Sequence, residues 1–335
     1  MKKILLILFI LSLFISIFTD ELICDKCNQP IDSNYVQIDK HIYHSECFTC
    51  FKCNKPIESN DFYVYKNHFY CQKCYSEYIS IKCNHCGKEI RGNYIKDYWG
   101  NYFHTYHKDE IIRCDYCQRL VSDNFTSLPL KTDDGFIICN KCKTSVISDR
   151  YEANKIFNEL VSIMYDFDLI IPQSKIQLFL VSKDKLKSVS KLDSITKMHK
   201  GFTEYQKTVN SNNKVIKKSY KIFILKDMPE LFFISALSHE LMHTWIHENS
   251  TGNISSKFTE GSCNYISYLT LNFLKENPPF LKNYDNDVID FIIYNLEKNP
   301  DKIYGDGYRE VKSFVHKYSI SIWLIYLRSH NKLPG

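Results

Sequence analysis

Cysteine pairs constrain this chain more than any other feature of its sequence. Thirteen of its fourteen cysteines lie between Cys24 and Cys142, nearly all in C-x-x-C pairs, and histidines stand where a pair is incomplete. Histidine cannot take part in a disulfide bond, whereas zinc binds both cysteine and histidine in four-coordinate sites. The spacing therefore predicts that the N-terminal part folds around metal ions and not around disulfide bonds.

The first cysteine-rich module contains eight candidate ligands, which divide into two sets of four. Their intervals are those of closed, structural zinc sites, and the module resembles a LIM domain in all eight ligands and in their spacing. A LIM domain has no open coordination position, so the resemblance implies a protein partner or an intramolecular role. The predicted sets are Cys24, Cys27, His44 and Cys47 for the first zinc, and Cys50, Cys53, Cys71 and Cys74 for the second.

The second module repeats this plan imperfectly. Six residues separate its two half-sites, where the first module has two, and a histidine replaces one cysteine. It resembles a LIM domain with this substitution, and we expect two more zinc ions; the alternative is that one half-site is empty. The predicted sets are Cys83, Cys86, His104 and His107 for the third zinc, and Cys114, Cys117, Cys139 and Cys142 for the fourth.

The N-terminal segment is apolar. Two lysines precede an apolar run from Ile4 to Phe18, which is shorter than the about 20 residues that span a bilayer. We expect residues 1–19 to be a secretory signal peptide, or else an uncleaved signal anchor, so that the protein is secreted, periplasmic or held at the membrane by this segment alone. The formal charge of +5 is too small and too evenly spread to indicate a nucleic-acid partner.

The composition changes near Asp149, and the remaining sequence shows longer periodic segments. Strands are predicted first and helices after them, which indicates an α+β domain with a short antiparallel sheet. The expected elements are a helix at 151–165, strands at 175–182, 202–209 and 218–225, and helices at about 227–249, 260–277, 287–298 and 308–329. The predicted organisation is a LIM domain at 20–78, a LIM-like module at 79–146 and a catalytic domain at 147–335.

The segment HELMH contains the H-E-x-x-H signature of zinc peptidases. His239 and His243 lie one helical turn apart and can both point a ring nitrogen at one zinc ion. Glu240 lies beside the remaining open position, where a carboxylate can take a proton from a water that the zinc activates. The motif alone is suggestive, and a third ligand is needed.

Two residues compete for the place of the third ligand. His247 lies two turns from His239, about 12 Å along the helix axis, and no glycine interrupts the helix between them. We therefore expect His247 at the surface or behind the ligands. Glu260, seventeen residues after His243, begins a second helix that can pack antiparallel to the first, with Gly261 allowing close approach. The alternative is that Glu260 only complements the dipole of its own helix.

The segment YGDGYRE contains the candidate donors for an oxyanion. A zinc peptidase needs such a donor opposite the metal, and Tyr304, Arg309 and His316 are available, of which we favour Tyr304. The alternative is that Gly305 and Gly307 form a turn that caps the last helix. Cys263, three residues after Glu260, is interpreted as a small buried apolar residue.

These segments together resemble a known family. The two cysteine-rich modules, HELMHTW, the EG-C glutamate helix and YGDGYREVKSFVHKYSI resemble the LIM-domain zinc metallopeptidases of the plant organ-size-regulator family, the ubiquitin-activated, DAR-type peptidases. The resemblance implies a glu-zincin fold, with His239, His243 and Glu260 as zinc ligands and Glu240 as the base. The chain has only two alanines, neither in an acidic ubiquitin-binding helix, so we expect the peptidase chemistry to carry over and the ubiquitin control not to.

The sequence thus predicts a zinc-dependent endopeptidase that acts on protein or peptide substrates. It would hold four structural zinc ions and one catalytic ion, and its LIM modules would recruit substrate or regulate the cleft. The strand at 218–225 is expected to be the sheet edge on which a peptide adds. One alternative is a LIM-type adaptor with an inactive zincin domain, and another is a zinc hydrolase with a non-peptide substrate.

Overall fold

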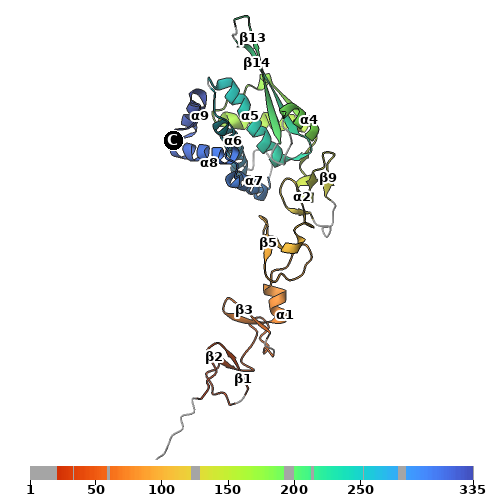
Figure 1. Cartoon of the computed structure of the whole chain (residues 1–335), viewed down its shortest axis with the longest axis vertical. Coiled ribbons are helices and arrows are strands. Elements are labelled where there is room, and N and C mark those ends of the chain that lie inside the picture. The colour runs from red at the N-terminus through yellow and green to blue at the C-terminus, as the bar shows by residue number, and fades with distance from the viewer. Residues whose placement is uncertain are drawn as a thin grey trace, which may run out of the picture. The chain divides into compact units, whose positions relative to one another are not determined.

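The computed structural model describes residues 21–32, 34–58, 61–121, 129–191, 200–212, 215–251, 253–277 and 284–334. The predicted signal segment at 1–19 lies outside these residues. Among the residues described, none of the helices combines the length and the apolar character that a bilayer span requires. The chain divides into two compact units, Met1–Tyr106 and His107–Gly335. Figure 1 shows both units.

Short antiparallel hairpins form the first unit. The second strand of each hairpin ends on a candidate ligand, His44, Cys71 or His104, and the strands of each are only three or four residues long. Between the first two hairpins lies a small aromatic core, in which the ring of Phe48 packs edge-on against those of Phe62 and Phe69. The elements are β1 Tyr35–Ile38, β2 His41–His44, β3 Phe62–Tyr65, β4 His68–Cys71, α1 Gln72–Cys74, η1 Tyr75–Ile79, β5 Tyr94–Lys96 and β6 Tyr102–His104.

The second unit begins with a small cysteine-bearing segment. Two two-stranded hairpins and one helical turn carry its four cysteines, and a short strand then leads into the larger domain. The elements are η2 Thr105–His107, which starts in the first unit, β7 Ile112–Arg113, β8 Leu120–Val121, β9 Leu130–Lys131, β10 Ile137–Ile138, α2 Asn140–Lys143 and β11 Val146–Ile147.

A three-stranded mixed sheet forms the centre of the larger domain, with strand order β12-β14-β13. β13 and β14 make a long antiparallel hairpin, and their paired ends project from the helices (Figure 1). β12 pairs with the other side of β14 in parallel, from Ile176↔Tyr220 to Val181↔Leu225. The elements are α3 Arg150–Asp166, η3 Gln173–Lys175, β12 Ile176–Val181, α4 Lys183–Ser190, β13 Gly201–Val209, β14 Val215–Leu225 and β15 Met228–Pro229.

Two expectations about this sheet are wrong. The sheet is mixed and not antiparallel. The connection through α4, which the periodicity did not predict, leads from β12 into β13, and the β13–β14 hairpin then brings β14 back parallel to β12. β14 is the central strand and not an edge, since it pairs on both sides. Its last residues, KIFIL, are nearly all buried, as is typical of a strand covered on both faces.

In the part of the chain that the structure describes, five further helices complete the domain. α5 is buried around most of its circumference, which is expected of a helix that runs through a core and not over a surface. The predicted single helix at 308–329 is wrong: it breaks at Ser319, whose φ of 136° ends one helix and caps the next. The helices are α5 Glu230–Asn249, α6 Ser256–Glu276, α7 Asn286–Lys298, α8 Tyr304–Tyr318 and α9 Ile320–Ser329.

The segment that carries Cys114 to Cys142 is joined to the start of α5. β11 pairs with β15, and the backbone N–H of Glu230 donates to the carbonyl of Ser145 at 2.7 Å. The ring of Tyr116 also contacts that of Phe232, with centroids 5.5 Å apart. These contacts hold the first turn of α5, so the fourth cysteine group stabilises the helix that carries HELMH.

We expect loss of the fourth group to loosen α5. The substitution Cys139→Ser removes a buried ligand and should increase hydrogen–deuterium exchange over residues 228–240, because β15 then loses a fixed partner strand. The control Cys53→Ser removes a ligand of the first unit and should leave this exchange unchanged. Equal exchange in both variants and the wild type would contradict this role of the fourth group.

Candidate metal centre

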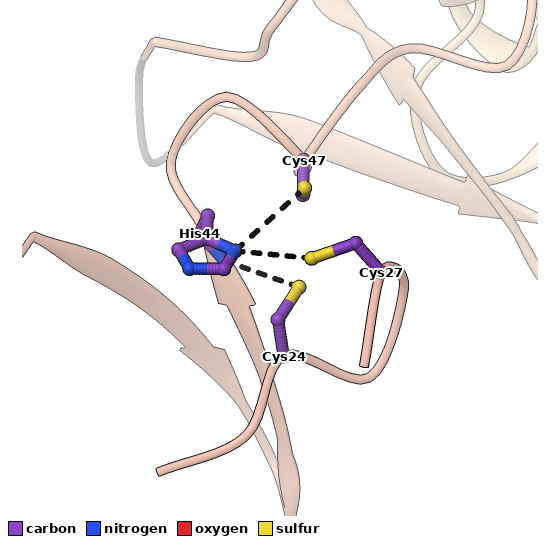
Figure 2. A group of neighbouring side chains, drawn as sticks. All are labelled: Cys24, Cys27, His44 and Cys47. Atoms are coloured by element: carbon purple, nitrogen blue, oxygen red, sulfur yellow. Dashed lines mark hydrogen bonds between the residues drawn. The ribbon is translucent and has the colours of Figure 1, made fainter. Parts of the chain in front are cut away.

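The structure brings together each of the four predicted cysteine and histidine sets. In every set the four candidate ligand atoms lie within 4.8 Å of one another, and all fourteen cysteines are free thiols. Figure 2 shows the first set, in which the Sγ of Cys27 and that of Cys47 lie 3.3 and 3.8 Å from Nδ1 of His44. Ligands of one tetrahedral zinc lie about 3.5 Å apart, so these groups are consistent with structural zinc sites.

Backbone donors favour the thiolate form that zinc requires. Burial raises the pKa of Cys24, Cys50 and Cys83, but backbone N–H groups of their own C-x-x-C turns and of the partner hairpins outweigh it and lower each pKa to about 6. The turn of each pair thus prepares its first cysteine for metal binding.

A fifth group of candidate ligands lies between α5 and α6. Nε2 of His239 lies 3.1 Å from Oε2 of Glu260, and Nε2 of His243 lies 3.6 Å from the same oxygen. Three ligands held about 2.0 Å from one zinc would be separated by about 3.3 Å, so the three atoms fit a single ion. The predicted triad is therefore assembled, and its role as a catalytic zinc site stays a prediction.

The charges in this group favour the ionised carboxylate. Burial alone would raise the pKa of Glu260, but its hydrogen bonds to His239 and His243 outweigh burial and hold the pKa well below its usual range. Burial lowers the pKa of His243, but its interactions with Cys263 and Glu260 outweigh burial and raise this pKa well above its usual value. A bound metal ion would take the place of the proton that His243 otherwise retains.

Glu240 is held by the edge strand β13. Its side chain is buried, and the hydroxyl of Thr203 donates to its Oε2 at 2.7 Å. Gly201 leaves room for this carboxylate, because a Cβ there would lie 2.8 Å from Cγ of Glu240. Neither residue was predicted from the sequence: they precede the motif by more than 30 residues, and only the sheet order brings them to it.

Asn264 orients the first histidine and was also missed. Its Oδ1 lies 3.0 Å from Nδ1 of His239, and its Nδ2 donates to the carbonyl of Tyr304 at 3.1 Å. An oxygen acceptor on Nδ1 leaves Nε2 of His239 without a proton and directed at the metal position. Asn264 follows Glu260 by four residues, about one turn of α6, and this spacing is the signal that could have indicated its role.

Tyr304 lies beside the site, whereas the other two donor candidates do not. Its ring stacks on that of His239 with centroids 6.4 Å apart. Burial, followed by the charges of Glu260 and Glu240, raises the pKa of Tyr304, so its hydroxyl keeps its proton. Arg309 instead donates to the carbonyls of Glu297 and Asn299. Arg309 and His316 line a separate open hollow of about 650 Å³, formed by residues of α6, α7, α8 and α9, which none of the predicted zinc ligands borders.

His247 lies as expected, whereas three glycines differ from what was considered for them. His247 stacks on Tyr205 of β13, with centroids 4.8 Å apart, and lies outside the ligand group as predicted. Gly261 permits a close helix approach, but to α8 and not to α5: a Cβ there would lie 2.3 Å from the backbone of Gly307. Gly305 and Gly307 belong to the first turn of α8, so the alternative of a capping turn at these glycines is wrong.

Comparison with known proteins identifies two domains in this chain. Residues 24–78 match the LIM domain family, and residues 173–278 match the DA1-like family, described as Protein DA1. The chain contains a LIM domain and a DA1-like domain. The DA1-like match includes the whole of α5 and α6, and therefore all three candidate ligands.

The distant homologues are plant DA1 and DA1-related proteins. Protein DA1 of Arabidopsis thaliana is 23% identical over 366 residues, which cover 93% of this chain and 68% of the relative. LIM domain-containing protein HDR3 of Oryza sativa subsp. japonica is 23% identical over 374 residues, covering 93% and 74%. Four and a half LIM domains protein 5 of Bos taurus is 28% identical over 122 residues, covering 36% and 40%. The likeness to the plant proteins thus extends through both domains.

We predict that Asn264 contributes to metal affinity. Asn264→Ala removes the acceptor that fixes His239 and should weaken zinc binding at this site by about 10- to 100-fold. Competition with a fluorescent zinc chelator measures the effect. Asn264→Asp, which keeps an oxygen acceptor, should retain affinity, and Asn272→Ala, two turns further along α6, serves as the control. Affinity that is unaltered in Asn264→Ala would contradict the assignment.

Proposed function

We propose that this chain is a zinc-dependent endopeptidase that hydrolyses peptide bonds in protein substrates. The observation that carries the proposal is the convergence of His239 and His243 on one oxygen of Glu260, with the buried carboxylate of Glu240 beside them. The homologous DA1 proteins are peptidases. A His₂Glu set with an open fourth position is a catalytic arrangement of zinc.

The residues around this site have distinct tasks in hydrolysis. Zinc held by His239, His243 and Glu260 would supply Lewis-acid activation of water and of the scissile carbonyl. Glu240 accepts a proton from the attacking water and later delivers it to the leaving amine. Thr203 fixes one oxygen of that carboxylate by its hydrogen bond, which leaves the other for the proton.

Tyr304 and β13 would act on the substrate. The phenol of Tyr304, which remains protonated beside two carboxylates, can donate a hydrogen bond to the oxyanion as it develops. Among the strands described, β13 pairs only with β14, so its outer edge is available for an extended peptide to add as a further strand. A peptide there would pass Thr203 and hence Glu240. β13 thus replaces β14 as the proposed docking edge.

The LIM domain indicates protein–protein interaction. We propose that it and the adjoining module recruit the substrate or regulate access to the site. Export of the protein, or its attachment to a membrane through residues 1–19, stays a prediction from the sequence, as does the placing of the domain boundaries.

The decisive test is the substitution Glu240→Gln. It should leave zinc bound but lower the cleavage rate of a peptide library by about 100-fold or more, because the amide cannot take a proton from water. The matched control is Glu248→Gln on the same helix, where the carboxylate bonds to Tyr220 and lies outside the ligand group. This control should keep full activity.

Other outcomes would point elsewhere. Equal cleavage by Glu240→Gln and the wild type would show that Glu240 is not the base. A wild-type chain that binds zinc at this site but cleaves no peptide would favour an adaptor with an inactive zincin domain or a hydrolase for another substrate.

A further inference from the structure

Cys263 faces the candidate metal site from α6. It follows Glu260 by three residues, so both side chains leave the helix on nearly the same side. Its side chain is fully buried, and its Sγ lies with the ring nitrogens of His239 and His243 in a group whose atoms are all within 4.8 Å of one another. The sequence interpretation of a small apolar residue accounts for the burial but not for this position.

Four candidate ligand atoms lie on this side of the two helices. Oε2 of Glu260 lies 3.1 and 3.6 Å from the Nε2 atoms of His239 and His243, and the Sγ of Cys263 lies within 4.8 Å of a ring nitrogen of each histidine. Cys263 is a free thiol and forms no disulfide. Two nitrogens, one carboxylate oxygen and one sulfur make a complete tetrahedral zinc set, and thiolate is among the preferred ligands of this ion.

We propose that Cys263 is a further ligand of this metal site and gives it a closed, latent state. The inference rests on the proposed function, because it concerns the same ion. In the open state three residues hold the metal and a water fills the fourth position. In the closed state the Sγ of Cys263 fills that position.

The exchange between the two states balances without an oxidant or a reductant. The thiol loses its proton, the sulfur–metal bond forms, and the water leaves the metal. The proton passes to the solvent with the departing water. The closed state then has no open position for water or for the scissile carbonyl, so it cannot hydrolyse a peptide until the exchange is reversed.

Cobalt spectroscopy of the full chain tests this proposal. Phenanthroline removes the metal of the accessible site while the cysteine-rich sites keep zinc, and one equivalent of Co²⁺ is then added. We expect a near-ultraviolet thiolate-to-cobalt charge-transfer band in the wild type. Cys263→Ser and Cys263→Ala should bind the same amount of Co²⁺ and lose the band. His239→Ala should bind no Co²⁺ at this site and sets the background from the cysteine-rich sites.

The possible outcomes separate this proposal from the proposed function. Co²⁺ binding that depends on His239, with the same spectrum in the wild type and in Cys263→Ser, would overturn the ligand role and leave the metal site intact. An absence of His239-dependent binding would overturn both. If both cysteine variants fail to fold, cadmium NMR of the wild type decides: a signal shifted downfield by one thiolate supports the proposal, and a shift typical of nitrogen and oxygen ligands alone contradicts it.

Discussion

The packing of α6 against α5 is the contact on which the site depends. Two nitrogens from one helix and an oxygen from the other must reach the same point, which requires a fixed distance and rotation between the helices. The packing around each of the two helices fixes this distance and rotation. α5 is buried nearly all round, and α6 is fixed from behind by α8, where Gly261 and Gly307 allow the backbones to touch. Asn264 adds a polar link, since it bonds to His239 on α5 and to the backbone of Tyr304 on α8.

The chain uses metal ligands in two contrasting ways. The four cysteine and histidine groups provide complete sets, and in the first three of them backbone N–H groups stabilise the thiolate of the first cysteine, which suits a structural ion. The group on α5 and α6 contains only one cysteine among imidazoles and carboxylates and is bordered by Glu240 and Tyr304. The two kinds of site are connected through the fold, because the fourth cysteine group holds β15 and the start of α5.

The parts of this structure that could be predicted from sequence are those set by near neighbours in the chain. C-x-x-C turns and H-E-x-x-H are formed within a single turn, and the three main strands were evident from their alternation. Sheet order depends on contacts between distant segments, so β14 was taken for an edge, although its buried KIFIL run indicates a central strand. Thr203 and Gly201 were missed for the same reason, and the break at Ser319 has no proline or glycine to mark it.

The central claim is that α5 and α6 bind a fifth metal ion, distinct from the four in the cysteine-rich groups. Native mass spectrometry of the purified chain measures this directly. The account predicts five zinc ions in the wild type and four in His243→Ala, with the loss confined to the site of His239, His243 and Glu260. Four ions in the wild type, and the same number in the variant, would contradict it.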